Sequence, residues 1–422
     1  MQSLIRKARV IDPQSVYNNK VVDLVIDNGI IVEIGFDLNV AASVVIEGAD
    51  LCVSAGWVDI FADYREPGFE HKETIATGLA CAAAGGYTEV LVCPNTQPAV
   101  SGKSVVQYLL QRAQGNIVQL HPIGSATQNA DGKELAEMLD MRKYGAIAFT
   151  DGWKPVQNAS LMMKALEYVK AFDGVIVQMP VDAALSSGGL MHEGIMSTRL
   201  GMSGIPVIAE SLLVHRDIEL LRYTKSRLHI TGVSTAESVA MIRKAKAEGL
   251  AVTCSVTPYH LALTDAALAG YDSAYKVSPP LRDEAHRQAL IAALADGTID
   301  CIAAHHRPQE WDAKTKEFDY AADGMAVQEI AFAIVWNAVR DAVTIDRLVD
   351  AIAIKPREIF GLEPHTIVKG SNASLTVFTT TGATLLKDAE VKSLSKNNPF
   401  IGEKLVGSVV AILNNNQTKV NK

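Results

Sequence analysis

Three side chains in the middle of this chain could together bind a divalent cation. Asp63, Asp151 and His305 each follow an apolar run of the kind that forms a buried strand. Two carboxylates and one imidazole are acceptable ligands for a divalent ion. A protein zinc site normally has four ligands, and no fourth is evident here, while Phe61 adds only volume. A hydrogen-bonded polar cluster that fills the pocket is therefore the favoured interpretation, and a weak metal site at these three residues is the alternative.

The elements that must position these side chains alternate between strands and helices. Short apolar runs recur, and each is followed by a segment of helical periodicity. Eight such units predict a parallel sheet covered by helices, closed into a TIM-type (β/α)8 barrel with its active site at the carboxyl ends of the strands. The strand ends hold Phe61, Asp63, Asn95, Asp151, Gln178, Gly232 and His305. The predicted strands are 57–61, 88–93, 117–123, 145–149, 174–178, 227–231, 250–256 and 299–304, and the predicted helices lie near 73–84, 102–113, 133–142, 158–171, 208–224, 235–248, 284–295 and 324–340.

Both ends of the chain have a different pattern from the middle. Short β-branched runs occupy the first 53 residues, and the Asp-Asn-Gly sequence at 27–29 is a hairpin signal. The C-terminal segment behaves alike. We therefore predict a small β-sandwich domain built from 1–53 and 366–422, and a barrel domain over 54–365. The polar stretch 414–419 is expected to be a frayed terminus.

The composition narrows the class of protein. The apolar fraction of 48% and the charged fraction of 20% are those of an ordinary globular protein. The net charge of −8 argues against a nucleic-acid or anionic-membrane partner, because no basic patch would neutralise phosphates. No run of 18 apolar residues and no signal peptide is present, so a cytoplasmic location is expected. The cysteines at 52, 81, 93, 254 and 301 are dispersed, which suits reduced, buried thiols.

Several motifs resemble those of the dihydroorotases, a branch of the amidohydrolase superfamily. Residues 59–68 read Asp-Ile-Phe-Ala-Asp-Tyr-Arg-Glu-Pro-Gly, where that family has Asp-x-His-x-His-x-Arg-Glu-Pro-Gly, and Glu-His-Lys-Glu-Thr follows at 70–74. The segment 145–152 resembles the one that carries an aspartate metal ligand, which would be Asp151. The resemblance covers nearly the whole chain and implies the barrel fold, a zinc site, and a substrate carboxylate held by Arg65 and Asn95.

The departures from the family pattern concentrate on its chemistry. The zinc-binding histidines of the first strand are replaced by Phe61 and Asp63, and those of strands five and six by Gln178 and Gly232. Residues 304–309 read Ala-His-His-Arg-Pro-Gln in place of Thr-Asp-His-Ala-Pro-His, so His305 stands at the position of the general acid/base. Ser278 stands where the family has a pyrimidine-contacting asparagine, and Gln309 stands where the strand-eight motif ends in a histidine.

These departures predict a protein retained for its shape. A zinc ion lowers the pKa of its bound water to about 7, which supplies a hydroxide nucleophile. Without the ion, the pKa of water stays near 15.7. We therefore expect no cofactor and no dihydroorotate hydrolysis. The alternative is an active dihydroorotase, or a related cyclic-amide hydrolase, with an altered single-metal zinc site at Asp63, Asp151 and His305.

The resemblance also implies a partner. Some relatives that have lost their ligands serve as non-catalytic partners of aspartate carbamoyltransferase, the preceding enzyme of pyrimidine synthesis. We expect a homo-oligomer that binds such an enzyme. The candidate interfaces are the segment from Arg307 to Phe318, including Trp311, and the rim of the pocket. Two smaller questions stay open: Arg65 is either an anion site or an ion-pair partner of Glu66 or Asp151, and His306 is expected to be a packing or loop residue.

Overall fold

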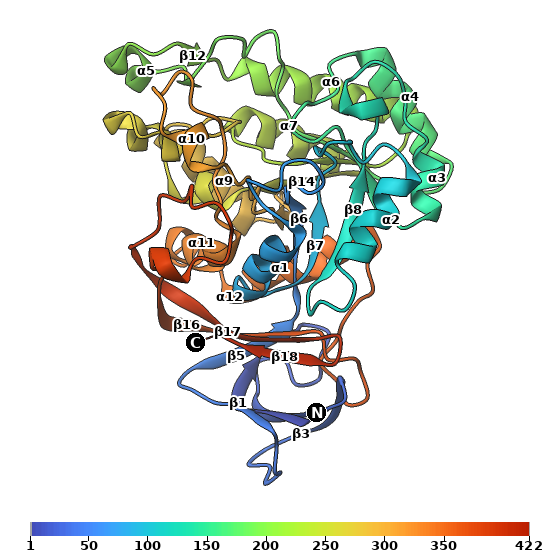
Figure 1. The fold of residues 1–422 in the computed structure, drawn as a ribbon, viewed down its shortest axis with the longest axis vertical. Coiled ribbons are helices and arrows are strands. Elements are labelled where there is room, and N and C mark those ends of the chain that lie inside the picture. Colours follow the sequence, from blue (N-terminus) through green and yellow to red (C-terminus); the bar gives the residue numbers. More distant parts are fainter. Residues whose placement is uncertain (1, 422) are drawn as a thin grey trace.

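A ring of parallel strands forms the upper part of the molecule (Figure 1). In this computed structural model, which describes residues 2–421, eight parallel strands follow one another in the order β6-β7-β8-β9-β10-β13-β14-β15. A bridge between Ala62 and His306 joins the two ends of the ring, and the Asp63 N–H donates to the His306 carbonyl at 2.9 Å. The TIM-type barrel prediction is confirmed.

The eight barrel strands overlap the eight predicted ranges. They are β6 (Trp57–Ala62), β7 (Tyr87–Val92), β8 (Gln119–Gly124), β9 (Ala148–Phe149), β10 (Ile176–Gln178), β13 (Leu228–Ile230), β14 (Val252–Val256) and β15 (Cys301–Ile302). Ile60, Leu91 and Val177 are among the apolar side chains of these strands that pack together in one buried cluster.

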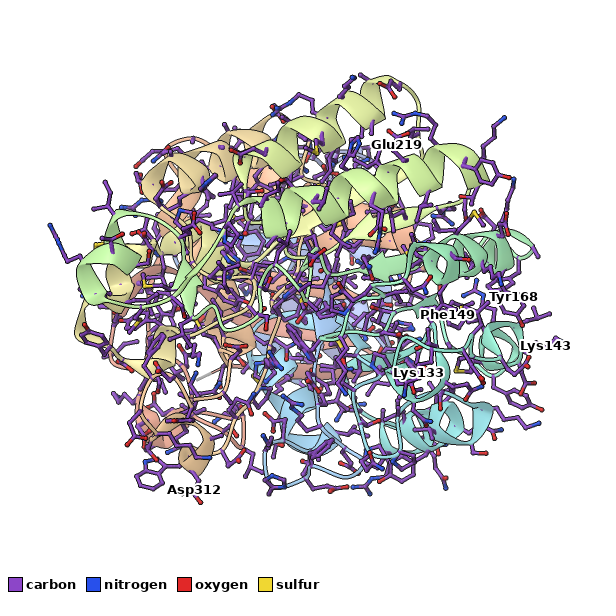
Figure 2. The ribbon with its side chains drawn as sticks, turned by 90° about the horizontal axis from the view of Figure 1, so that it is seen from above. Lys133, Lys143, Phe149, Tyr168, Glu219 and Asp312 are labelled. Atoms are coloured by element: carbon purple, nitrogen blue, oxygen red, sulfur yellow. The ribbon has the colours of Figure 1, made fainter. Side chains whose placement is uncertain are left out.

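Four of the barrel helices, α1, α4, α7 and α9, begin at a polar side chain that caps them. Thr74, Asn158, Thr235 and Asp283 each accept a hydrogen bond from a backbone N–H of the first turn, which satisfies a donor that the helix cannot. Viewed from above, helices surround the strands, and charged side chains such as Lys143 lie at the rim (Figure 2). The helices are α1 (Ile75–Ala84), α2 (Lys103–Arg112), α3 (Met138–Lys143), α4 (Ala159–Lys170), α5 (Ile195–Leu200), α6 (Ile208–Thr224), α7 (Ala236–Ala247), α8 (Pro258–Ala262), α9 (Glu284–Ala295), α10 (Trp311–Lys314), α11 (Ala331–Val339), α12 (Ile345–Val349) and α13 (Lys355–Phe360).

A second sheet lies below the barrel in Figure 1 and is built from both ends of the chain, as predicted. Its strand order is β18-β17-β16-β5-β1-β2-β3, with β4 paired to β1. The predicted hairpin joins β2 and β3 through Asn28 and Gly29, both at positive φ. The strands are β1 (Gln2–Val10), β2 (Val21–Asp27), β3 (Ile30–Gly35), β4 (Val44–Ile46), β5 (Leu51–Ala55), β16 (Leu375–Leu385), β17 (Lys404–Asn414) and β18 (Gln417–Val420). The exact domain boundaries stay a prediction.

The C-terminal tail is ordered, so the prediction of a frayed terminus is wrong. Strand β18 pairs with β17 through a tight turn at Asn415 and Asn416, whose φ angles are 50° and 58°. Asparagine tolerates this left-handed conformation better than most residues, which favours a hairpin. The Asn414 amide donates to the carbonyls of Thr88 and Ile117, at 3.0 and 2.9 Å, and so ties the hairpin to the barrel.

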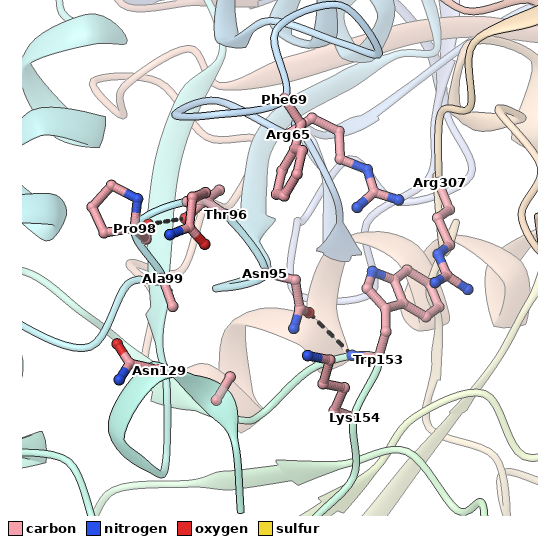
Figure 3. Close-up of a pocket in the computed structure, with 12 residues that line it drawn as sticks. Arg65, Phe69, Asn95, Thr96, Pro98, Ala99, Asn129, Trp153, Lys154 and Arg307 are labelled. Atoms are coloured by element: carbon pink, nitrogen blue, oxygen red, sulfur yellow. Dashed lines mark hydrogen bonds between the residues drawn. The ribbon is translucent and has the colours of Figure 1, made fainter. Parts of the chain in front are cut away.

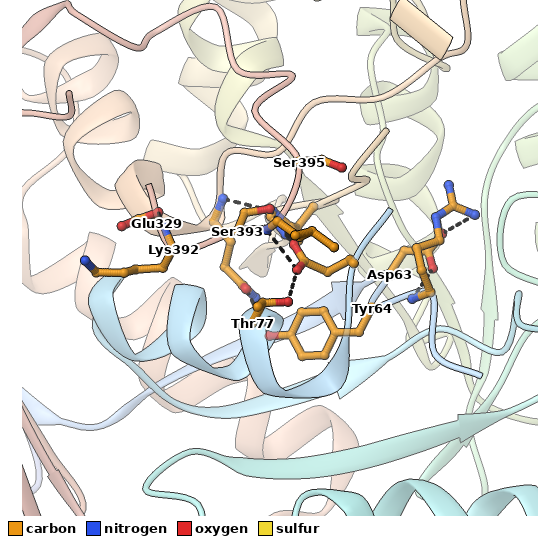
Figure 4. A network of polar contacts seen from close by, with 12 residues as sticks. Asp63, Tyr64, Thr77, Glu329, Lys392, Ser393 and Ser395 are labelled. Carbon is orange, nitrogen blue, oxygen red and sulfur yellow. Dashed lines mark hydrogen bonds and ion pairs between the residues drawn. The ribbon is translucent and has the colours of Figure 1, made fainter. Parts of the chain in front are cut away.

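A network of polar contacts fixes the loop before β17 against the barrel (Figure 4). Glu73, fully buried at the start of α1, accepts hydrogen bonds from the Ser393 hydroxyl and from the Leu394 N–H. His306 lies 3.4 Å from the same carboxylate. Burial alone would raise the pKa of Glu73, but the bonds from His306, Ser393 and Thr77 outweigh it and lower the pKa. His306 therefore takes part in a buried polar network that connects the barrel to this loop.

Two further expectations can be compared with the structure. All five cysteines are free and buried, which agrees with the predicted reduced thiols. Among residues 2–421, no helix is both long enough and apolar enough to cross a membrane.

Candidate functional site

Three aromatic rings meet at the carboxyl ends of the barrel strands. Phe61, at the end of β6, stacks on His305 with ring centres 4.6 Å apart and planes tilted by 33°. Trp153 packs edge-on against both, at 5.2 and 5.4 Å. Phe61 and His305 are completely buried. We call these three residues the aromatic plug, because they occupy the mouth of the barrel where the metal ligands were expected.

His305 fills the space next to Gly232. A Cβ on Gly232 would lie 2.5 Å from Cε1 of His305, so neither a histidine nor even an alanine fits there without movement. The Nε2 atom of His305 is hydrogen-bonded to the Thr231 hydroxyl at 2.8 Å. Burial lowers the pKa of His305 well below its usual value, and nearby His260 adds to the effect. The ring is therefore neutral at physiological pH.

Asp63 links two side chains at the mouth of the barrel, Trp153 and Arg65. Its Oδ2 accepts a hydrogen bond from Trp153 Nε1 at 2.7 Å and pairs with Arg65 Nη1 at 3.2 Å. The expectation that Arg65 pairs with Glu66 or Asp151 is therefore wrong. Glu66 points elsewhere, to Arg112 Nε at 2.7 Å, because its position after Arg65 directs it toward α2.

Asp151 is also fully engaged. The Thr127 N–H and hydroxyl donate to its two carboxylate oxygens at 2.9 and 2.5 Å. Burial raises the pKa of Asp151 although these bonds oppose the shift. Asn95 donates to the Asp151 carbonyl at 3.0 Å and accepts from the Trp153 N–H at 3.0 Å. The side chain of Asn95 thus positions the loop that carries Trp153.

Neither Gln178 nor Gly232, the residues at the expected zinc-ligand positions of strands five and six, offers an atom that is free to bind a metal. Both ends of the Gln178 amide are bonded to the backbone of Val156, at 3.1 and 3.2 Å. His229, deeper in the barrel, contacts the hydroxyls of Thr253 and Ser255 at 2.9 and 3.1 Å. Burial lowers the pKa of His229 to about 3, so this ring is held neutral within the polar core.

These residues do not fit the zinc site that the resemblance implies. Phe61 and Gly232 have no donor atom, and the amide of Gln178 is occupied. Among the described residues, Asp63, Asp151 and His305 do not form a group whose ligand atoms all lie within 4.8 Å of one another. Zinc needs several such atoms at about 2.0–2.2 Å from one point.

One group elsewhere in residues 2–421 meets that distance criterion. His192, Asp283 and His286 have ligand atoms within 4.8 Å of one another, near the start of α9. None of the three lines the mouth cavity described below. Arg282 donates to His192 Nδ1 at 3.2 Å, and burial together with this charge lowers the pKa of His192 to about 4. A cation would therefore meet the charge of Arg282.

Beside the aromatic plug the mouth is open. A cavity of about 510 Å³ lies here, and Figure 3 shows the side chains around it. We call it the cationic cavity, because Arg65, Lys154 and Arg307 line it and no carboxylate among the described residues does. The complete lining is Arg65, Phe69, Asn95, Thr96, Gln97, Pro98, Ala99, Asn129, Ala130, Trp153, Lys154 and Arg307.

The cavity contains both predicted carboxylate-binding residues, Arg65 and Asn95. Ser278 and Gln309 do not line it, and Gln309 instead bonds Lys72 Nζ at 2.8 Å. Sequence reasoning missed Trp153 and Arg307 as site residues. The sequence did contain a hint for Arg307, because an arginine replaces the alanine of the family motif at this position. Whether the arginine side chain points into the cavity, however, depends on the tertiary structure.

Comparisons with solved structures show which known proteins share this fold. L-hydantoinase (dihydropyrimidinase) from Arthrobacter aurescens superposes with a TM-score of 0.87, covering 100% of this chain and 97% of the other at 22% identity. A D-hydantoinase structure gives 0.84 at 18% identity, covering 100% and 96%. The fold is therefore that of the hydantoinase-type amidohydrolases, a barrel with a β domain.

Sequence comparisons define the family. A dihydro-orotase-like family model matches residues 51–238. A protein named dihydroorotase from Acetivibrio thermocellus is 40% identical over 420 residues, covering 99% of this chain and 98% of the relative. Another, from Pelobacter propionicus, is 38% identical over 416 residues and covers 98% of each. The chain belongs to the dihydroorotase family.

Proposed function

We propose that this member of the dihydroorotase family does not hydrolyse dihydroorotate and acts as a structural partner of an aspartate carbamoyltransferase. The observation that carries the proposal is the aromatic plug, with the Phe61 and His305 ring centres 4.6 Å apart where zinc ligands were expected. Without a metal, the pKa of the attacking water stays near 15.7, so a neutral water molecule would have to attack the cyclic amide. His305, buried and neutral, replaces the acid/base carboxylate.

The direct test measures metal content and turnover together. Elemental analysis of the protein purified without chelator should give less than one equivalent of transition metal per chain. Dihydroorotate hydrolysis should stay at background with added zinc, manganese or cobalt. A stoichiometric metal, or turnover that disappears in Asp151→Ala, contradicts the proposal.

An active dihydroorotase is the second candidate, and a specific observation favours it. Identity of 40% over 99% of the chain to a protein named dihydroorotase is a close relationship. Activity would require a single-metal site at Asp63, Asp151 and His305. The Asp151 carboxylate would have to leave Thr127, and His305 Nε2 would have to leave Thr231. The test above separates the two candidates, because only the second requires a bound metal.

The partner surface proposed for this chain lies around α10. Trp311 and Tyr320 are each 76% exposed there, while Phe318 between them is buried and anchors the segment. Exposed aromatic residues are common anchors of protein interfaces, and a specific interface buries at least about 1,000 Å². The net charge of −8 leaves protein as the favoured macromolecular partner.

Co-purification from the native host tests the partner. The tagged chain should elute from a sizing column as a homo-oligomer or larger assembly and retain an aspartate carbamoyltransferase, identified by mass spectrometry. Trp311→Ala combined with Tyr320→Ala should release the enzyme. Tyr223→Ala, at a residue 72% exposed on α6, is the matched control and should retain it. Recovery of a monomer alone contradicts the structural role.

A further inference from the structure

One arginine in the barrel mouth, among the described residues, has no carboxylate oxygen within 4 Å of its guanidinium, although the charges of Asp323 and Asp63 act on it from farther away. Arg307 follows β15, and its guanidinium carbon lies 4.4 Å from the centre of the Trp153 ring. Its Nε is buried without a hydrogen-bond partner, and within residues 2–421 its side chain forms no ion pair. A guanidinium has five N–H donors in a planar fork, and a buried N–H such as this Nε normally has an acceptor. Arg307 as a whole is half-buried and lines the cavity.

The charge around the cationic cavity is unbalanced as well. Of its three cations, only Arg65 has a carboxylate partner, Asp63, and the Nε of Arg65 is also buried without a hydrogen bond. Burial lowers the pKa of Arg307; the more distant Asp323 carboxylate opposes this shift, and repulsion from Arg65 adds to it. Lys154 brings a further positive charge to the exposed side of the cavity. An anion bound here would relieve both the desolvation and the repulsion.

The two guanidinium groups come from opposite ends of the strand order. Arg65 follows β6 and Arg307 follows β15, and Figure 3 shows both beside the ring of Trp153. A guanidinium fork binds a carboxylate through two parallel hydrogen bonds. Two separate forks suit two separate planar carboxylates better than one compact phosphate. A volume of about 510 Å³ lies within the range of small-molecule sites.

We propose that the cationic cavity binds a small dicarboxylate without a metal, and that Arg307 is the anchor for its second carboxylate. The proposal rests on the proposed function, because it takes the mouth to work without zinc. Arg65 and Asn95 were already expected to hold one carboxylate. The new element is the second anchor, Arg307, over the Trp153 ring, which turns a site for one anionic group into a site for two.

The experiment is calorimetric titration of the full chain with succinate, in EDTA and at low ionic strength, with tryptophan fluorescence as a second readout of Trp153. Succinate should bind with one site per chain, and propionate at least about tenfold more weakly. Arg307→Met should weaken succinate by at least about tenfold and change propionate little. Arg340→Met, at an exposed arginine after α11, is the matched control and should bind succinate like the unaltered chain.

Three results would overturn the proposal: no binding of succinate at millimolar concentration, equal binding by Arg307→Met, or inorganic phosphate binding as tightly as succinate. If Arg307→Met does not fold, Arg307→Lys keeps the charge, loses the planar fork, and should still weaken succinate. The outcome is independent of the hydrolysis test. Metal-dependent turnover with succinate binding in EDTA would contradict the proposed function alone, and absence of both would contradict the dicarboxylate site alone.

Discussion

The aromatic plug and the cationic cavity lie side by side at the barrel mouth, and they differ in how their polar groups are satisfied. Around the plug, Asp63, Asp151 and Gln178 each have protein partners, and the rings of Phe61 and His305 exclude solvent. The one buried polar atom of the plug without a hydrogen bond, among the described residues, is the uncharged Nδ1 of His305. Around the cavity, among the described residues, Arg307 and Lys154 have no carboxylate oxygen within ion-pair distance, and the charges of Asp323 and Asp63 reach Arg307 only from farther away. One region has been filled with side chains, and the other has been kept open and charged.

The difference suggests that side chains kept for stability and side chains kept for ligand binding lie in separate regions of the mouth. A region that only fills space tolerates any set of side chains that packs and satisfies its hydrogen bonds. Unpaired cations cost stability, so an open cationic cavity is hard to explain by folding alone. The four predictions below test whether the plug stabilises the fold and the cavity does not.

The largest effect is expected at the plug. Phe61→Ala removes a fully buried ring that packs against both His305 and Trp153, and should lower the free energy of unfolding by about 3–5 kcal/mol. Phe69→Ala, the same change on the half-buried wall of the cavity, should cost less than half as much. Urea denaturation measures both, and equal losses would remove the distinction between the two regions.

Acid should weaken the fold through the neutral histidine beneath the plug. The pKa of His229 is about 3 in the folded state, below the unfolded value near 6.5, so the unfolded chain binds the extra proton. The free energy of unfolding should fall as the pH drops from 6.5 toward 3, by up to about 1.4 kcal/mol per pH unit from this group. Urea titrations across this window should become flatter in His229→Gln. They should be unchanged in His215→Gln, which alters an exposed histidine.

A smaller effect is expected at Gly232. Gly232→Ala places a Cβ 2.5 Å from His305 Cε1 at a φ of 72°, and should cost about 1–3 kcal/mol. Gly249→Ala has a similar φ of 80° but no atom within 4 Å of the new Cβ. The control therefore reports backbone strain alone. If the two variants lose equal stability in thermal unfolding, His305 does not fill the space of a lost ligand.

The smallest effect is expected in the cavity. Arg307→Met removes a charge without a partner and should change the free energy of unfolding by no more than about 0.5 kcal/mol, with stabilisation an acceptable result. Arg357→Met is the contrast, because Arg357 Nη2 bonds Glu89 at 2.7 Å at the base of the barrel. That variant should lose about 3–5 kcal/mol. A large loss in Arg307→Met would show that Arg307 has a structural role.

The sequence alone determined the barrel, the β domain and the family. Strand and helix order follow from local patterns, since apolar runs and helical periodicity repeat eight times and the caps are adjacent residues. The missing donor atoms at Phe61 and Gly232 could likewise be read directly, because residue type decides what can bind a cation. The C-terminal hairpin was missed, since its stability comes from Asn414 bonding to distant carbonyls.

The tertiary structure alone decided what replaced the expected ligands. The partner of Arg65 is Asp63 and not Asp151. The loop after β9 places Trp153 against Asp63, and the loop after β8 places Thr127 against Asp151. Arg307 points beside Trp153 because the barrel closes between β15 and β6, which lie some 240 residues apart. Contacts over such a separation leave no periodic signal in the sequence. Residue types set which chemistry is available, and only the closure of the barrel sets which groups meet.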